Sequence, residues 1–446
     1  MMSVEDERSA RAMVPDEPPR PAEPRVVRPV RDRVELLPRS LDEAVPDDHP
    51  ARAIWALLEQ LDLAAFYAPI KALVDRPGRP ASDPRVLLAL WILATADGVG
   101  SARRLARLCD EHDAYRWLRG GAPVDYHLLA DFRVAQRAAL DELLTQTVAV
   151  LLHEGLVTLA RVARDGLRVR AGAGAGSFRR RKSLERCLGE ARAQVERLAA
   201  EREHPDPGVS RRQRAARERA ARDRLERVER ALAALPAVEA SKERQRQKLP
   251  KGRRERVPEA RVSTTDPEAR VMKLADGGFR PAVNVQLATT RDGLAITGVQ
   301  VTNRGADGGL AAPVERQVAE RAGQHPGDYL LDGGLATRDD ITTLEQRGAT
   351  VYAPVEPPRT TTSGRLAIDP RPDDSEAVTA WRQRMGTEAA QAIYQERGAT
   401  AEWTNAQARI RYGLRQFTVR GLTKITGVVL LVAVTHNLLR YLALRA

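Results

Sequence analysis

Apolar residues recur at helical spacing through the first third of the chain, from about residue 50 to residue 155. Leucine, isoleucine and tryptophan return every three or four positions, which is the period of a helix face turned toward a core. They stand at Ile54, Leu57, Leu58, Leu61, Leu87, Leu90, Trp91, Leu93, Leu105, Leu108 and Trp117. The pattern predicts an all-helical N-terminal domain over residues 46–155. The polar, proline-rich residues 1–45 before it are expected to form a disordered tail.

After residue 155 the period changes to that of strands. An apolar run over 156–163 ends at Arg164-Asp165-Gly166, and two alternating runs are joined by Arg291-Asp292-Gly293 as a tight hairpin. We predict strands at 156–163, 282–290, 294–302, 328–331 and 350–355, and helices at 311–322, 337–346 and 375–412. An antiparallel hairpin followed by α/β units is what a ribonuclease H-like mixed sheet requires. We therefore expect an α/β domain with flanking helices over residues 156–446.

A basic insertion interrupts this domain over residues 179–256. It holds 25 Lys and Arg against 13 Asp and Glu, an excess equal to the net charge of +12 of the whole chain. Sparse apolar stripes on both sides of a proline-containing break predict a helical hairpin. A salt-bridged, solvated helix pair is one interpretation. The other is an arm that binds the DNA backbone, with Arg179, Arg180, Arg181 and Lys182 as phosphate contacts.

Composition narrows the class of protein. The sequence pI of about 10.1 favours a polyanionic partner, and aromatic residues at 4% argue against a stacking platform for single-stranded nucleic acid. Two cysteines without CxxC spacing exclude a disulfide framework, argue against a structural zinc site and indicate a reducing cytosol. The apolar run over 425–444 is long enough to span a membrane. We predict a buried core helix there, because polar and charged residues interrupt the run.

Six Asp-Gly dipeptides occur, and their context separates them. They lie at Asp97, Asp165, Asp276, Asp292, Asp307 and Asp332. The dipeptide alone is a turn signal. Only Asp165 and Asp332 directly follow apolar strand-like segments without an immediate return strand. A carboxylate at a strand end is held rigidly, so two neighbouring strands would bring both acids together, although a turn-only role is the alternative for each.

A third acid is expected from a helix packed on the sheet. Residues Tyr394, Arg397, Glu402, Asn405 and Arg409 fall within one arc of about 140° on a helical wheel. One acid among such side chains suits a site that holds metal and clamps phosphate, and a solvated face is the alternative. Three acids without a Cys/His cluster favour a hard cation, Mg²⁺ or Mn²⁺. Two such ions, about 3.5–4 Å apart, would activate the attacking oxygen and stabilise the leaving oxygen of a phosphoryl transfer.

Three blocks of this sequence resemble the DDE transposases of bacterial insertion sequences. The nearest group is the eleven-eighty-two type, within the larger group related to the IS-five elements. The first block is DPRVLLALWILATADGVGSARRLARLCDEHDAYRWLRGGAPVDYHLLADFR at 83–133. The second joins ARDGLRVRAGAGAGSFRR at 163–180, DPEARVMKLADGGFRPAVNVQLATT at 266–290, VTNRGADGG at 301–309 and DYLLDGGLATRDDI at 328–341. The third is YQERGATAEWTNAQARIRYGLRQFTVRGLTKI at 394–425, ending in HNLLR at 436–440.

The resemblance implies the roles of the site residues. Asp165, Asp332 and Glu402 would be the catalytic, metal-binding acids, and the tyrosine-arginine-glutamate-lysine signature of the family falls on Tyr394, Arg397, Glu402 and Arg409. Arginine replaces the usual lysine at 409, one extra residue separates Arg397 from Glu402 relative to the commoner spacing, and Trp403 stands where many relatives have proline.

The implied activity is hydrolysis of a phosphodiester at the transposon ends and strand transfer into target DNA. The implied partners are terminal inverted repeats and target DNA bound by a homodimer in the cytoplasm, with residues 46–155 as a DNA-end-binding or dimerisation domain. Two alternative functions fit the same features. One is a nuclease of the same fold that cuts DNA without joining it, and the other is a catalytically inactive DNA-binding relic of a transposase. A membrane protein is a weaker third, supported only by the apolar run near the C-terminus.

Overall fold

The computed structural model describes residues 38–72, 80–201, 208–355 and 368–445. Almost all of the expected N-terminal tail lies outside the described residues. Among the described residues between Pro50 and His153, seven helices follow one another, as the apolar period predicts: α1 (Pro50–Gln60), α2 (Ala64–Tyr67), α3 (Pro84–Ala96), α4 (Ala102–Glu111), α5 (Asp113–Arg119), α6 (Tyr126–Ala135) and α7 (Arg137–His153). Asp83 caps α3, because its carboxylate accepts a hydrogen bond from the Arg85 N–H at 2.8 Å and Pro84 follows it.

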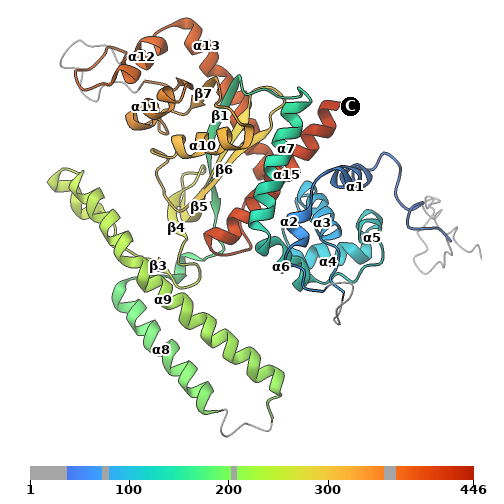
Figure 1. Ribbon diagram of the computed structural model, residues 1–446. Coiled ribbons are helices and arrows are strands. Elements are labelled where there is room, and N and C mark those ends of the chain that lie inside the picture. The colour runs from blue at the N-terminus through green and yellow to red at the C-terminus, as the bar shows by residue number, and fades with distance from the viewer. Residues whose placement is uncertain (1–37, 73–79, 202–207, 356–367, 446) are drawn as a thin grey trace, which may run out of the picture. The chain divides into compact units, whose positions relative to one another are not determined.

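The sheet of the second region mixes parallel and antiparallel strands. Its strands are β1 (Arg161–Arg170), β4 (Arg270–Lys273), β5 (Phe279–Thr290), β6 (Ile296–Thr302), β7 (Asp328–Leu331) and β8 (Thr350–Tyr352). The order is β4-β5-β1-β7-β8, with β6 also paired to β5 (Figure 1). The β5–β6 hairpin and β5–β1 pair antiparallel, whereas β7 pairs parallel with β1 and β8. A mixed sheet of this order, flanked by helices, is consistent with the predicted ribonuclease H-like fold.

Strand β1 differs from its sequence prediction. It begins at Arg161 and continues to Arg170, so Asp165 and Gly166 lie inside the strand rather than in a turn after it. The reason is tertiary: β5 pairs with β1 residue by residue from Val162 to Arg170, which satisfies the backbone groups of the Asp-Gly pair. Glycine at 166 leaves room for the Gln286 side chain, because a Cβ there would lie 2.6 Å from its Nε2 and force that amide to shift.

Side chains alternate between two cores on the two faces of the sheet. Val285 and Leu287 belong to a core shared with α3 and with α15 (Leu422–Arg445), whereas Val162 and Ala288 belong to a core shared with α10 (Ala311–Ala322) and α11 (Arg338–Gln346). The helical region and the sheet therefore share one continuous hydrophobic core through α15.

Helix α15 is the core helix that the sequence predicts. It is long and apolar enough to cross a membrane by length and composition, yet 67% of its most apolar window is buried inside the protein. Its polar residues are satisfied internally: Asn437 accepts from the Ile296 N–H at 2.8 Å and donates to the Ile296 carbonyl at 2.9 Å. Burial lowers the pKa of His436 to about 4, so this histidine is neutral at pH 7 beside the Leu294 carbonyl.

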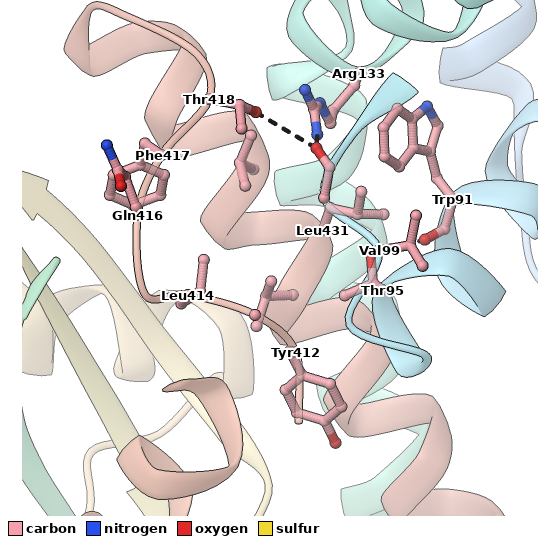
Figure 2. A pocket seen from close by; sticks show the side chains of 14 residues that line it. Trp91, Thr95, Val99, Arg133, Tyr412, Leu414, Gln416, Phe417, Thr418 and Leu431 are labelled. Atoms are coloured by element: carbon pink, nitrogen blue, oxygen red, sulfur yellow. Dashed lines mark hydrogen bonds between the residues drawn. The ribbon is translucent and has the colours of Figure 1, made fainter. Parts of the chain in front are cut away.

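A small cavity of about 40 Å³ lies where α3, α6 and α15 meet the loop after residue 411 (Figure 2). The guanidinium of Arg133 is buried at its edge, donates to the Gly100 carbonyl at 2.6 Å and lies 4.3 Å from the Trp91 ring centroid. Burial lowers its pKa to about 10. The volume is enough for a few waters and far below that of a ligand pocket. The feature therefore belongs to the packing of the helical region on the C-terminal segment.

The insertion is a helical hairpin, as its charge and apolar stripes predict. Helices α8 (Arg181–Ala200) and α9 (Arg211–Gln247) run antiparallel, followed by a short 3-10 helix at Lys251–Arg256 (Figure 1). Strands β2 (Phe178–Arg179) and β3 (Val262–Ser263) pair at its base. A small apolar cluster that includes Leu184 and Leu235 joins the two helices there. The remaining described elements are a 3-10 turn at Ala175–Ser177, α12 (Glu376–Met385), α13 (Glu388–Arg397), a π-helical turn at Gly398–Glu402 and α14 (Trp403–Ile410).

Candidate active site

Sheet register places the two aspartates side by side. Arg164 of β1 is the partner of Leu331 of β7 in the parallel ladder, so the next residue of each chain segment is an aspartate, Asp165 and Asp332. Each carboxylate accepts a hydrogen bond from the N–H of the glycine that follows it, at 2.7 Å from Gly166 and 2.8 Å from Gly333. The sequence prediction that two strands bring these acids together matches this placement.

The helix that carries the third acid is interrupted by the π-helical turn. Residues Gly398–Glu402 form this turn between α13 and α14. A π-helical turn has i→i+5 spacing and accommodates one residue more than an α-helical turn. The extra residue noted between Arg397 and Glu402 lies in this turn. On an ideal α-helix these two side chains would stand at opposite ends of the expected arc, whereas here Arg397 Nη2 donates to Glu402 Oε1 at 3.0 Å.

Arg397 links the acids of the site. Its Nη1 lies 3.8 Å from Asp165 Oδ2, while its Nη2 contacts Glu402, whose side chain is 61% exposed. The Tyr394 ring lies beside the guanidinium, with 5.8 Å between the guanidinium carbon and the ring centroid. Burial lowers the pKa of Arg397, but Tyr394, Asp165 and Asp332 outweigh it and the net shift is upward. The guanidinium therefore stays charged between the carboxylates.

Asn405 of α14 completes the contact to β1. Its Nδ2 donates to Asp165 Oδ2 at 3.0 Å, and its own Oδ1 is buried without a hydrogen-bond partner among the described residues. Burial is the main cause that raises the pKa of Asp165, and the charge of Asp332 raises it further. The Gly166 N–H, Arg397 and Asn405 oppose this rise without cancelling it. The raised pKa of Asp165 is therefore mainly an effect of burial, to which the neighbouring carboxylate of Asp332 adds.

The oxygen atoms around Asp165 suit a hard divalent cation. Three carboxylates and the unpartnered Asn405 Oδ1 are donors of the kind that Mg²⁺ and Mn²⁺ prefer. In the described parts of the chain, no group of three or more His, Cys, Asp or Glu is close enough to hold a metal ion as placed. Glu402 points to Arg397 instead, so a shared ion requires its side chain to turn from the guanidinium toward the two aspartates.

Sequence reasoning missed the residue that fixes this helix on the sheet. Glu396 forms ion pairs of 2.8 Å with Arg161 of β1 and with Arg291 of the β5–β6 turn. Burial raises the pKa of Glu396, but its hydrogen bonds and charge contacts with both arginines outweigh this and lower it overall. The signal in the sequence was an acid next to Arg397, but its partners lie over 100 and over 230 residues earlier in the chain, so no local pattern could identify them.

The other predicted residues lie in different surroundings. Arg409 is half-buried on α14, one turn beyond Asn405, without a hydrogen bond or ion pair in the described structure. Four basic residues, Arg179, Arg180, Arg181 and Lys182, lie at the base of the helical hairpin rather than among the acids. Arg180 pairs with Glu259 at 2.8 Å and Arg181 with Glu239 at 2.6 Å.

The fold and these acids define the class, an α/β protein with carboxylates at two neighbouring central strands of its sheet. The comparisons with known families narrow this class. Residues 39–135 match a family described as a transposase domain of type DUF772, and residues 358–442 match one described as a transposase DDE domain. These two segments of the chain are therefore similar to transposase domains. The second match includes Tyr394, Arg397, Glu402, Asn405 and Arg409, whereas Asp165 and Asp332 lie outside both. No curated protein and no solved structure matches the chain.

Proposed function

We propose that this protein is a DNA transposase of a bacterial insertion sequence, of the eleven-eighty-two type. It would hydrolyse a phosphodiester at each transposon end and transfer the freed strand into target DNA. One arrangement supports the proposal above all. The strand register brings Asp165 and Asp332 together, and the helical segment with Arg397, Glu402 and Asn405 contacts Asp165. That helix lies within the matched DDE domain.

In this proposal Asp165, Asp332 and Glu402 hold divalent metal, Mg²⁺ or Mn²⁺, as two ions. Bound metal would supply charge stabilisation for the attacking and leaving oxygens of an in-line displacement. The side chains of the protein itself position the acids and the phosphate. The sheet fixes two carboxylates, and Asn405 orients Asp165 through its Nδ2. Arg397, which pairs with Glu402 in this structure, would bind a phosphate oxygen when Glu402 serves as a metal ligand.

Further residues and partners belong to the same proposal. Tyr394 and Arg409 flank Arg397 and Asn405 on the helix and would contact the phosphodiester backbone near the acids. The substrates are double-stranded DNA with terminal inverted repeats and target DNA, held by a homodimer inside the bacterial cell. The helical region over residues 46–155 would bind the DNA ends or form the dimer contact.

The test uses the purified full chain with duplexes that carry the ends of its own element, in Mg²⁺. We expect nicking at the ends and joined product with target DNA, and loss of both by about 10³-fold or more in Asp165→Asn and Glu402→Ala, because each removes a metal ligand. Asp276→Asn is the matched control, since Asp276 begins an Asp-Gly pair in an exposed turn outside the site.

The outcomes separate the rivals. Cleavage without joined product would favour a nuclease of the same fold. Equal nicking by wild type and Glu402→Ala, with DNA binding retained, would mean a catalytically inactive DNA-binding protein. Activity lost equally in Asp276→Asn would show that the assay reports general damage rather than this site.

A further inference from the structure

The positive charge of the helical hairpin is not spread evenly over its surface. Its described body, residues 183–201 and 208–239, has twelve Lys and Arg against nine Asp and Glu. The segment 242–256 has eight Lys and Arg against two Glu in only fifteen residues. We call this segment the basic knuckle. Its cations are Lys242, Arg244, Arg246, Lys248, Lys251, Arg253, Arg254 and Arg256.

Ion pairs neutralise half of the twelve arginines of the body, five of them within the body and one, that of Arg230, with Glu268 outside it. Six of them, Arg186, Arg192, Arg197, Arg222, Arg224 and Arg230, each pair with a glutamate at 3.2–4.0 Å. In the basic knuckle only Arg246 has such a partner, Glu243 at 3.4 Å, within the described structure. Six knuckle cations are exposed: Arg244, Lys248, Lys251, Arg253, Arg254 and Arg256. These six arginines make the middle of the hairpin a salt-bridged helix pair, whereas the knuckle has uncompensated charge. At the opposite end of α9, Arg211, Arg212, Arg217 and Arg219 are also exposed without an acidic partner in the described structure, but they lie away from the base of the hairpin.

The geometry of the hairpin presents the knuckle beyond the paired region. Arg181, the first residue of α8, pairs with Glu239 of α9, and α9 continues to Gln247. Eight further residues at 1.5 Å each correspond to about 12 Å of helix. Figure 1 shows α9 extending beyond the start of α8. The chain then returns through the 3-10 helix to Val257, which is buried. Most residues of the knuckle are exposed, on α9 and on the 3-10 helix alike.

The base of the hairpin extends this surface. Arg180 and Arg181 pair with Glu259 and Glu239 and hold the base together, whereas Arg179 and Lys182 are exposed and have no acidic partner in the described part of the chain. The base follows β1 after a short connection that includes the 3-10 turn at Ala175–Ser177. A DNA duplex that contacts the knuckle would thus also reach residues joined to the strand of the candidate site.

We infer that the basic knuckle, and not the paired body of the hairpin, is the surface that binds the DNA phosphate backbone. This inference rests on the proposed function for the identity of the polyanion. Uncompensated arginine and lysine bind phosphates and release counterions, which makes the affinity depend on salt with a slope of about 0.9 per phosphate contact. The contact is to the backbone, so the sequence of the DNA does not change it.

The test measures binding of a fluorescent 30-base-pair duplex to the full chain by anisotropy, in EDTA, over a range of KCl concentrations. The knuckle variant changes Arg244, Lys248, Lys251, Arg253, Arg254 and Arg256 to Gln. We expect its salt slope to fall by about 3 to 5 and its affinity to fall at least about tenfold at 0.1 M salt. The body variant changes the six paired arginines named above to Gln and removes the same total charge. Its slope should change by less than about 1.

A charge-preserving variant, with Arg244, Arg253, Arg254 and Arg256 changed to Lys, should bind like wild type and show that the knuckle acts through charge. Far-UV circular dichroism checks that each variant keeps its helices. Equal losses in the knuckle and body variants, or an unchanged slope in the knuckle variant, would overturn the inference. Because EDTA prevents metal-dependent cleavage, this experiment measures DNA binding alone. Its result can therefore be interpreted even if the nicking experiment rejects the transposase proposal.

Discussion

The strand-borne and helix-borne acids of the candidate site are positioned by different kinds of structure. Asp165 and Asp332 are fixed by ladder register, and each is oriented by the N–H of the next residue. Glu402 ends a π-helical turn, is 61% exposed and is held by one ion pair to Arg397. Backbone pairing keeps Asp165 and Asp332 in position when neighbouring side chains change, whereas a single exposed ion pair contributes little to the position of Glu402. We therefore expect activity to be more sensitive to changes around the helix-borne acid than to changes around the strands.

Deletion of Ala399 is the strongest test of this contrast. Ala399 is exposed within the π-helical turn, and its loss should convert the turn to α-helix and rotate Arg397 relative to Glu402 by about 100°. We expect metal-dependent nicking to fall by about 10²-fold or more, as for a misplaced catalytic group. Nicking rates with circular dichroism measure the effect. Ala399→Ser keeps the length and should stay near wild type, and a fully active deletion variant would contradict the role of the turn.

Arg397→Gln tests the link between the two sets of acids. Loss of the guanidinium removes the partner of Glu402 and a phosphate contact, so nicking should fall by about 10- to 100-fold. It also removes a charge that opposes the raised pKa of Asp165, so this pKa should rise further. A metal ligand must be deprotonated, and the acid limb of the pH–rate profile should move to higher pH. Arg397→Lys should restore much of the wild-type profile. If the acid limb of the pH–rate profile stays in place in Arg397→Gln, the charge of Arg397 does not influence the pKa of Asp165.

Asn405→Ala tests the hydrogen bond from α14 to the strand-borne Asp165. The change leaves Asp165 without the Nδ2 donor at 3.0 Å but does not alter the ladder that positions it. We expect a loss of about tenfold in nicking with an unchanged strand register. Rates at several Mg²⁺ concentrations show whether metal binding or turnover is affected. A loss as large as that of Asp165→Asn would mean that the strand does not position this acid by itself.

Glu396→Gln should have the smallest effect on rate and a measurable effect on stability. The pKa of Glu396 is lowered overall, so its stabilisation is present above its unfolded value of 4.5 and is lost as pH falls through the folded value. Its side chain is 33% exposed, so solvent screening limits the loss to about 1 kcal/mol at pH 7. Urea unfolding at pH 7 and near pH 4 measures this, and the difference from wild type should shrink at the lower pH. If the difference in unfolding free energy between wild type and Glu396→Gln is the same at both pH values, the charge of Glu396 is not the cause of the stabilisation.

Local pattern was sufficient for much of the fold. Helix α10 and strand β7 have the bounds that their periodicity predicts, and the apolar C-terminal run is the core helix expected from its interrupting polar residues. The helical hairpin followed from charge and sparse apolar stripes. Asp332 was correctly placed at the end of a strand. These features depend on interactions between residues close in sequence, which a one-dimensional pattern records.

The contacts between segments were decided only by tertiary structure. Strand β1 runs through Asp165 and Gly166 because β5, more than 110 residues later, pairs with it throughout. Glu396 anchors its helix through Arg161 and Arg291, and the pairing of the hairpin's arginines depends on which glutamates the folded helices bring near. The sequence by itself determined which residue types were available and where helices and strands would form. Which charges meet, and which are left without a partner, depends on distances across the chain that only folding sets.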